Sequence, residues 1–405
     1  MSDLLDYADR PVDPRTGIPV VGMVGGGQLA RMTHQAAIPL GQSLRVLCVS
    51  EDDPAARVTR DYVLGHHTDL EALRAFAAGC DVITFDHEHV PNEHLRVLVE
   101  AGVKVHPGPE ALLHAQDKLV MRNKLGELGL PVPPFSPVKQ VDDVLGFGAR
   151  FGWPAVLKAA RGGYDGRGVW MLDSPADAER LVGELLDAGT SLLVEQCVPL
   201  RREFAALIAR SPFGQGAAWP LVQTVQREGI CVEVLAPAPE VHPELAASAQ
   251  ELALRVADEL GVVGVLAVEL FDTDAGVLVN ELAMRPHNSG HWTMDGALTS
   301  QFEQHLRAVL DYPLGATDPV APAVVMANVL GAPQTPAMSV DERLHHLFAR
   351  FPDVHAHLYG KAERPGRKVG HVNVLGERME DVREKARLAA HWLSHAEWLD
   401  GYRIH

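Results

Sequence analysis

Short apolar runs alternate with segments of helical periodicity over the first quarter of the chain. Val20–Val24, Leu44–Val49 and Asp81–Phe85 are short, largely apolar, β-rich runs, whereas Gln28–Leu40 repeats its apolar residues at helical spacing. Strands that are separated by helices of this length predict a parallel, doubly wound sheet. The pattern therefore predicts an α/β domain in the first quarter of the chain.

The pattern changes twice further along the chain. Residues 113–210 begin with helical segments and continue with strands around a glycine-rich turn. Residues 211–405 contain a long helix near Ala246–Leu260, a strongly β hairpin, and a C-terminal region of small strands and helices. We expect a small second domain and a larger α+β domain in these two stretches, after the first domain at 18–112 and a disordered extension at 1–17.

Composition narrows the class of protein. The 405 residues are 47% hydrophobic and 22% charged, with a formal net charge of −17, which argues against nucleic-acid partners and an anionic membrane surface. The four cysteines are scattered, as is typical of a reducing compartment. The acidic opening stretch has no apolar core of a signal peptide, and no apolar run approaches the ~20 residues of a membrane helix. We expect a cytoplasmic protein.

The first candidate motif lies between a predicted strand and a predicted helix. Gly25–Ala30 reads G-G-G-Q-L-A and satisfies G-x-G-x-x-A, and Glu51 lies about where a ribose-binding acid would follow in a dinucleotide site. A nicotinamide or flavin enzyme is therefore one alternative. The same glycines can let a helix N-terminus approach any phosphate, or can form only a tight turn.

A second glycine-rich segment follows a lysine. Lys158 ends an apolar run, and Arg161–Gly168 then reads R-G-G-Y-D-G-R-G. Such glycine density lets backbone N–H groups close over phosphates, and the lysine supplies a point charge for phosphate oxygens. No G-K-[ST] follows, so this is not a P-loop. The alternative is a flexible β-turn.

An apolar strand that ends in a carboxylate is the third candidate. Leu192–Val198 reads L-L-V-E-Q-C-V, and Glu203 follows a few residues later. A strand running into a linker suits adenosine recognition: its backbone can contact the base, and Glu203 can accept hydrogen bonds from ribose hydroxyls. By itself the segment is an ordinary strand end.

A predicted hairpin brings two glutamates together. Val265–Asp272 and Val277–Met284 are β-rich and joined by a short turn. If the hairpin is symmetric about Ala275, Glu269 faces Glu281 directly, with Cβ atoms roughly 5 Å apart. Facing carboxylates repel unless a cation lies between them, and oxygen ligands suit Mg²⁺. The alternative is a solvated pair on an edge hairpin.

Two polar segments complete the candidates. Met284–Trp292 reads M-R-P-H-N-S-G-H-W, and such crowding of Arg, His, Asn and Ser is expected where anionic intermediates are held and protons are moved. Four cations within eight residues, in an acidic chain, indicate a phosphate-sized pocket; they are Lys361, Arg364, Arg367 and Lys368. A solvated basic loop is the alternative.

Taken in order, these motifs resemble the ATP-grasp superfamily, and within it the carboxyaminoimidazole ribonucleotide synthetases of purine biosynthesis. The strings that carry the resemblance are G-G-G-Q-L-A-R-M, D-K-L-V-M-R-N-K-L, K-A-A-R-G-G-Y-D-G-R-G, V-E-Q-C-V, N-E-L-A-M-R-P-H-N-S-G-H-W-T and Y-G-K-A-E-R-P-G-R-K-V-G-H. The match runs from about Pro19 to the end of the chain.

The resemblance implies a fold and a reaction. The fold would be ATP-grasp, with the doubly wound domain first, a small lid domain within 113–210 and a C-terminal α+β domain. ATP would phosphorylate bicarbonate to carboxyphosphate, which collapses to CO₂, and the exocyclic amine of 5-aminoimidazole ribonucleotide would capture it, leaving ADP and phosphate. ATP and Mg²⁺ are the implied cofactors, small molecules the implied substrates, and a homodimer the implied assembly.

The resemblance also implies site residues. Glu269 and Glu281 would hold the metal, and Arg285, His287, Asn288 and Lys368 would be catalytic. ATP would be bound by Lys118, Lys158, Gly163, Tyr164, Asp165, Gly166, Arg167, Gly168, Val169, Glu195, Gln196, Cys197, Val198, Glu203, Asn280 and Glu281. The ribonucleotide and carboxyphosphate would be bound by Gly27, Gln28, Leu29, Tyr164, Asp165, Arg167, Arg285, His287, Asn288, Ser289, Lys361, Arg367 and Lys368.

Two segments depart from the family pattern. Gln223 and Gln226 stand where relatives usually carry a Glu and a His, so no histidine function is carried over to that strand. Thr84–His89 reads T-F-D-H-E-H and differs from the expected Phe-Glu version. Its His-Glu-His spacing could bind a metal, but we favour a strand-end loop near the substrate.

Overall fold

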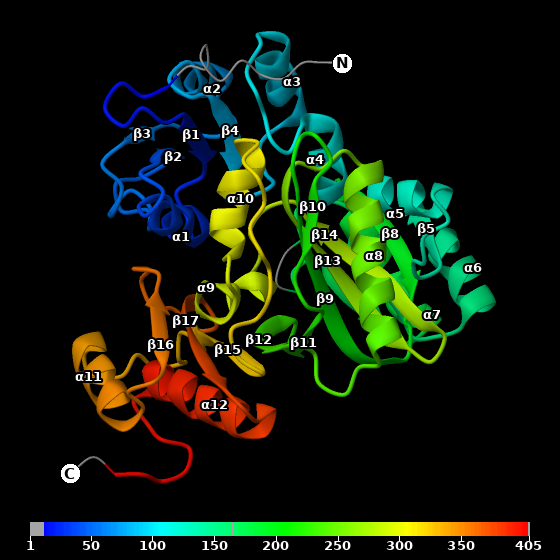
Figure 1. Cartoon of the computed structure of the whole chain (residues 1–405). Helices are drawn as coiled ribbons and strands as arrows, with labels where there is room; N and C mark the ends of the chain where they lie inside the picture. Colours follow the sequence, from blue (N-terminus) through cyan, green and yellow to red (C-terminus); the bar gives the residue numbers. More distant parts are fainter. Residues whose placement is uncertain (1–11, 164–165, 404–405) are drawn as a thin grey trace.

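Three β-sheets organise the computed structural model, which describes residues 12–163 and 166–403 (Figure 1). A four-stranded parallel sheet opens the chain, a four-stranded antiparallel sheet follows, and a nine-stranded antiparallel sheet takes in most of the second half. No helix in the described part of the chain is long and apolar enough to cross a membrane.

The first sheet has the strand order β3-β2-β1-β4, all parallel. Its strands are β1 (Val20–Val24), β2 (Ser43–Cys48), β3 (Tyr62–Leu64) and β4 (Val82–Phe85), with helices α1 (Gln28–Ala37), α2 (Leu70–Ala77) and α3 (Asn92–Glu100). The central strand β1 has no polar side chain and β2 is mostly apolar, because helices cover both faces of the sheet. The predicted doubly wound sheet is confirmed.

One covering helix comes from far along the chain. Helix α10 (Gln301–Val309) packs with α1 against one face of the first sheet, where Leu306 and Val309 meet Val21 and Met23 (Figure 1). Helices α2 and α3 cover the opposite face. The first sheet is thus completed by residues about 280 positions downstream of its first strand.

The second sheet forms a small lid-like unit with two helices. Helices α4 (Pro109–Gln116) and α5 (Lys118–Glu127) lead into β5 (Phe135–Val138), α6 (Val141–Phe151), β6 (Ala155–Ala159), β7 (Val169–Leu172), α7 (Pro175–Asp187) and β8 (Leu192–Gln196). The strand order is β5-β8-β6-β7. One core joins the sheet to α6 and α7, through residues such as Val144, Leu157 and Val182.

The large sheet runs β14-β13-β9-β11-β12-β15-β17-β16, with β10 paired to β9. Its strands are β9 (Leu200–Arg210), β10 (Gly216–Ala218), β11 (Val222–Arg227), β12 (Ile230–Ala236), β13 (Gly264–Thr273), β14 (Gly276–Ala283), β15 (Ala323–Leu330), β16 (His355–Leu358) and β17 (Lys368–Gly376). Helix α8 (Pro243–Glu259) covers one part of it, and α11 (Val340–Arg350) and α12 (Met379–His395) cover another. The 3₁₀ turn η2 (Asn288–Gly290) and the short α9 (Thr293–Gly296) follow β14.

Two expected boundaries differ from the structure. Strand β9 pairs along its whole length with β13, so the large sheet begins at Leu200 and not after residue 210. The described end of the expected disordered extension, residues 12–17, is folded: Asp13 is buried, bridges to Ile18 and accepts hydrogen bonds from Arg15 and Ser43. Residues 1–11 lie outside the described chain.

Candidate functional site

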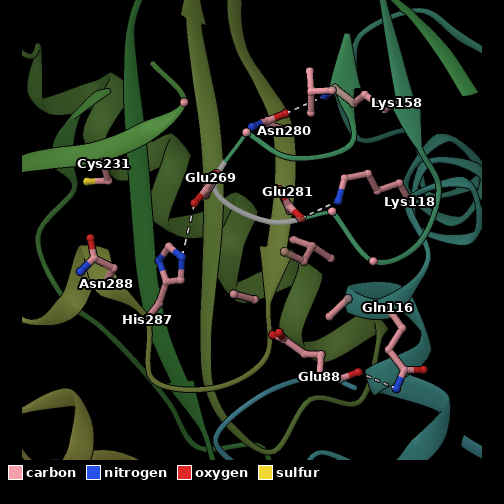
Figure 2. Close-up of a pocket in the computed structure, with 18 of the residues that line it drawn as sticks. Glu88, Gln116, Lys118, Lys158, Cys231, Glu269, Asn280, Glu281, His287 and Asn288 are labelled. Atoms are coloured by element: carbon pink, nitrogen blue, oxygen red, sulfur yellow. Dashed lines mark hydrogen bonds and ion pairs between the residues drawn. The ribbon is translucent and has the colours of Figure 1, made fainter. Parts of the chain in front are cut away.

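A cavity of about 1330 Å³ lies where the lid unit, the large sheet and the loops of the first domain meet. Lys158 and Cys197 enter from the lid side, Glu203 and Glu281 from the large sheet, and Gln28 from the start of α1. Figure 2 shows part of this wall, with side chains from several elements directed toward one space. Most of the residues predicted from sequence meet here.

The hairpin of β13 and β14 places Glu269 opposite Glu281, as predicted, but by a different route. The turn lies at Thr273–Gly276, so the pairing near it is offset by one residue from symmetry about Ala275. A β-bulge at Asn280 then inserts one unpaired residue and restores the Glu269–Glu281 pair. Without that bulge, Glu269 would face Asn280.

Three carboxylates share this part of the wall. Burial, and then repulsion by Glu281 and Glu203, raises the pKa of Glu269 to about 8. Burial also raises the pKa of Glu203. A side-chain hydrogen bond with Gln226 acts in the opposite direction but does not outweigh the burial. Within residues 12–163 and 166–403, no cluster of three or more acidic, His or Cys side chains is placed to hold a metal by itself. A cation bound here needs further ligands, and Mg²⁺ commonly takes them from nucleotide phosphates.

Two lysines stand opposite these acids. Lys118 Nζ lies 2.6 Å from Glu281 Oε1, and Lys158 Nζ lies 3.2 Å from Asn280 Oδ1 (Figure 2). Lys118 is the first residue of α5, directly after the N-cap Asp117. Both positions suit point-charge contacts to phosphate oxygens beside a metal.

A buried ion triad fixes Lys158. Glu195 Oε2 lies 2.7 Å from Lys158 Nζ, and Glu195 Oε1 lies 2.7 Å from Arg122 Nε. Burial alone would raise the pKa of Glu195, but the two cations outweigh it and hold the pKa below its ordinary value. Both carboxylate oxygens of Glu195 are therefore engaged in ion pairs within the protein. Only the backbone of Glu195 is available to contact a nucleotide base.

The glycine-rich loop lies over the cavity from the lid side. Gly162, Gly166 and Gly168 have φ values of 78°, 76° and 73°, a region that glycine adopts without strain. A Cβ at Gly166 would lie 3.3 Å from the Cα of Gly229, in the turn between β11 and β12. The loop therefore reaches across from the lid to the large sheet. Tyr164 and Asp165 lie outside the described residues.

Arg285 is held by a glutamate from the first domain. Arg285 Nε donates to Glu88 Oε2 at 2.9 Å, and the backbone N–H of Met284 donates to Glu88 Oε1 at 3.1 Å. Gln116 Nε2 in turn donates to the carbonyl of Glu88 at 2.9 Å (Figure 2). Glu88 follows the end of β4, so the predicted strand-end loop is confirmed, and its acid orients the guanidinium.

His287 lies between the acids and the cations. Its Nδ1 accepts the backbone N–H of Ser289 at 3.4 Å and lies 2.9 Å from Ser289 Oγ, whose hydroxyl can also donate to it. The neutral ring then carries its proton on Nε2, 3.4 Å from Glu269 Oε1. Burial, and then the charges of Arg285 and Lys368, lowers the pKa of His287 to about 3. The ring is therefore neutral at physiological pH, although the ordinary pKa of a histidine lies near neutrality.

Amide and basic side chains close the far wall. Asn288 and Asn328 exchange two amide hydrogen bonds, of 3.0 and 2.8 Å. Lys361 donates to Gln28 Oε1 and so joins the basic loop to α1. Lys368, the first residue of β17, lines the cavity.

The N-terminus of α1 is already capped. Gly27 N and Ala30 N donate to the two carboxylate oxygens of Asp86, at 2.5 and 3.1 Å. A Cβ at Gly27 would lie 2.2 Å from Asp86 Oδ2, which explains the glycine. The cap places a carboxylate where a dinucleotide would place its pyrophosphate, which argues against the nicotinamide or flavin alternative.

Most predicted site residues line the cavity; they are Gln28, Leu29, Lys118, Lys158, Gly163, Gly166, Val169, Glu195, Gln196, Cys197, Val198, Glu203, Glu269, Asn280, Glu281, Arg285, His287, Asn288, Ser289 and Lys368. Others do not form part of its wall; these are Gly27, Arg167, Gly168, Lys361 and Arg367. The backbone N–H of Gly27 donates to Asp86, and Arg367 donates to the carbonyl of Ala362.

Several lining residues were not predicted; they include Glu88, Gln116, Cys231, His291 and Tyr359. Glu88 and His291 lay within segments singled out from sequence, so their polar character was a usable signal. Cys231 comes from β12, where an isolated cysteine in a β-rich run carries no such signal.

Comparison with known proteins agrees with this geometry. A model of the ribonucleotide synthetase preATP-grasp domain matches residues 18–116, one of the ATP-grasp domain matches 123–302, and one of the phosphoribosylaminoimidazole carboxylase C-terminal domain matches 324–385.

Relatives and solved structures point the same way. The chain is 68% identical over 388 residues to the N5-carboxyaminoimidazole ribonucleotide synthase of Mycobacterium tuberculosis, covering 96% of this chain and 90% of the relative. It is 50% identical to that of Corynebacterium ammoniagenes, covering 95% and 94%. The Aspergillus clavatus enzyme, solved with ADP and 5-aminoimidazole ribonucleotide, has a TM-score of 0.84 and 30% identity, covering 93% of this chain and 98% of that one. The Thermus thermophilus enzyme has a TM-score of 0.83 and 39% identity, covering 94% and 99%. The chain thus belongs to the N5-carboxyaminoimidazole ribonucleotide synthase family of ATP-grasp enzymes.

Proposed function

We propose that this enzyme uses ATP and bicarbonate to carboxylate the exocyclic amine of 5-aminoimidazole ribonucleotide in purine biosynthesis, with carboxyphosphate as the intermediate. One observation carries the proposal: the paired acids Glu269 and Glu281 and the cations Arg285 and Lys368 open into one cavity. A nucleotide with its metal and a second anionic reactant can therefore meet there.

The acid end of the cavity suits the nucleotide. Lys118 and Lys158 are placed for phosphate oxygens, the backbone of 195–198 for the adenine, and Glu203 for the ribose. Mg²⁺ would be held by Glu269 and Glu281, and when bound it neutralises phosphate charge and polarises the transferred phosphoryl group. The raised pKa of Glu269 supports this assignment, because a bound cation would offset both the burial and the repulsion by Glu281 and Glu203 that raise it.

The cationic end suits bicarbonate and carboxyphosphate. Arg285 can bind two oxygens of one anion, which a lysine cannot copy, and Glu88 fixes its orientation. Lys368 adds a second charge. His287 is neutral at physiological pH and carries its proton on Nε2, so its N–H can donate a hydrogen bond to an oxygen of the bound anion. The proton that the amine loses when it attacks CO₂ can pass directly to the phosphate released from carboxyphosphate.

Compartment and assembly are also part of the proposal. We assign the reaction to the cytoplasm, which the four free cysteines support. We assign the ribonucleotide phosphate to the basic segment that contains Lys361 and Arg367, and we expect a homodimer by resemblance to the family.

The test is ADP release measured with each reactant omitted in turn. We expect ADP to form only when ATP, Mg²⁺, bicarbonate and 5-aminoimidazole ribonucleotide are all present, and other amines or carboxylates to replace the ribonucleotide poorly. Faster ADP release with another acceptor would assign the chain a different ligase reaction.

A further inference from the structure

A single buried glutamine binds the loop that follows the acid hairpin. Gln301, the first residue of α10, is fully buried. Its Oε1 accepts the N–H of His287 at 2.8 Å, and its Nε2 donates to the carbonyl of His287 at 2.8 Å. The same Nε2 lies 2.9 Å from Nδ1 of His291.

These contacts determine which way the amide points. An N–H can only donate and a carbonyl can only accept, so the backbone of His287 requires oxygen at Oε1 and nitrogen at Nε2. The second hydrogen of Nε2 then points at Nδ1 of His291, which must accept it. The neutral ring of His291 therefore carries its proton on Nε2.

A second buried histidine provides a direct comparison. His305 Nδ1 accepts the N–H of Val265 at 3.1 Å, so this ring also carries its proton on Nε2, and that N–H donates to Thr84 Oγ1 at 2.7 Å. Nε2 of His291 forms no hydrogen bond with any residue of the described ranges. His291 as a whole is 1% exposed, but it lines the cavity, and its Nε2 is not among the fully buried, unpartnered side-chain atoms of the described residues.

The surroundings of His291 favour an anion as the missing partner. Burial lowers the pKa of His291 well below its ordinary value, and His287, Lys368, His357 and Arg285 act in the same direction. The ring is therefore a neutral donor surrounded by cationic and neutral groups. His371 packs against it from β17, with ring centroids 5.0 Å apart.

We propose that His291 donates its Nε2–H to an oxygen of the anion bound by Arg285 and Lys368, and that Gln301 is the positioning residue that fixes its tautomer. Gln301 would also hold the backbone of His287, so one amide aligns both histidines. The identity of the anion, bicarbonate or carboxyphosphate, rests on the proposed function.

Substitutions at His291 test the donor. Glutamine can place an N–H near the position of Nε2, whereas phenylalanine fills the space without a donor. We expect His291→Phe to lower kcat/KM for bicarbonate by about 10- to 100-fold, the size of a lost hydrogen bond to a charged group, and His291→Gln to restore most of it. The KM for ATP should change little in both.

The matched control is His305→Gln, which removes a buried histidine of the same tautomer outside the cavity. It should lower Tm and leave kcat/KM for bicarbonate unchanged. Equal activity losses in His291→Phe and His291→Gln, or a loss in His305→Gln as large as in His291→Phe, would overturn the assignment of a specific donor.

The tautomer can be read without turnover, from ¹⁵N chemical shifts of labelled histidines, with His291 identified by its absence in His291→Gln. We expect the wild-type ring protonated on Nε2, and Gln301→Glu, which replaces the donor by an acceptor, to move the proton to Nδ1. Inorganic phosphate added with Mg²⁺-ADP should shift the Nε2 signal.

A wild-type ring protonated on Nδ1, or an Nε2 signal that phosphate leaves unmoved, would refute the proposal. The two hypotheses remain separable. A phosphate response in an enzyme that fails the bicarbonate assay would keep the anion site and reject the proposed reaction, and the reverse result would reject His291 alone.

Discussion

Two carboxylates of the same cavity are held in opposite electrostatic surroundings. Glu195 lies between Lys158 and Arg122, with contacts of 2.7 Å to each, and its pKa is lowered. Glu269 faces Glu281 and feels Glu203, and its pKa is raised to about 8. Both side chains lie on β-strands, Glu195 near the end of β8 and Glu269 within β13.

The difference separates a structural acid from an acid that awaits a ligand. Glu195 has its counter-ions within the protein, so its charge is balanced whether or not a nucleotide is bound. Glu269 shares its surroundings with like charges, which the cations Lys368 and Lys118 offset only in part. An imbalance of this kind is what a metal cation corrects.

The largest expected effect comes from Glu281→Gln. It removes one of the two facing carboxylates, and we expect ADP formation to fall on the order of 10³-fold, because metal stabilisation of phosphoryl charge contributes several kcal/mol. Tm should change little, since the substitution removes both the like-charge contact with Glu269 and the ion pair with Lys118. Wild-type ADP release in this variant would rule out the paired-carboxylate metal site.

Glu195→Gln is expected to lower the stability of the folded protein, whereas Glu281→Gln acts mainly on ADP formation. The substitution leaves Lys158 and Arg122 buried with a neutral partner, and breaking such a pair costs about 3–5 kcal/mol. Urea unfolding measures the change. The control is Glu110→Gln, which removes an exposed contact of 2.9 Å to Arg96 and should change stability by about 0.5 kcal/mol or less. Equal stability of the two variants would contradict the structural role of Glu195.

The pH dependence of stability separates the two acids further. The unfolded chain titrates Glu269 near its ordinary pKa of 4.5, and the folded chain near 8. Between these values the folded state binds more protons than the unfolded state, so nucleotide-free stability should fall as pH rises from about 4.5 to 8. Glu269→Gln should flatten that slope, measured by urea unfolding at several pH values. An unchanged slope would place the titration elsewhere.

The smallest effect is expected for Glu203→Gln. Glu203 contributes to the raised pKa of Glu269, so its neutralisation should narrow the pH window of the previous experiment. If Glu203 also binds the ribose, the KM for ATP should rise about 10-fold with little change in kcat, as for the loss of one hydrogen bond made equally in ground and transition states. A fall in kcat alone would place Glu203 nearer the reacting phosphate.

Local sequence patterns were sufficient to predict the strands that carry these acids. The apolar alternation around Glu269 and Glu281 identified the hairpin, although the turn at Thr273–Gly276 and the bulge at Asn280 had to offset each other for the pair to form. The bulge at Asn280 depends on how both strands pack, and the residue pattern of neither strand predicts it.

Long-range partners were not accessible from sequence. Glu88 and Arg285 are 197 residues apart, so nothing local connects them. Similarly, Gly27 was expected to approach a phosphate, because sequence alone did not place Asp86, 59 residues downstream, at the helix terminus. Charges were recognised in each segment, but which charges neutralise one another is decided by the fold.

Helix α10 has a consequence for dissecting the enzyme into fragments. It seals one face of the first sheet with Leu306 and Val309, and its His305 joins Thr84 of β4 to Val265 of β13. A fragment that stops before Gln301 would expose the apolar residues Val21 and Met23 to water. Such a fragment should associate or aggregate, so domain exchange between relatives should transfer α10 together with the residues of the first sheet that it covers.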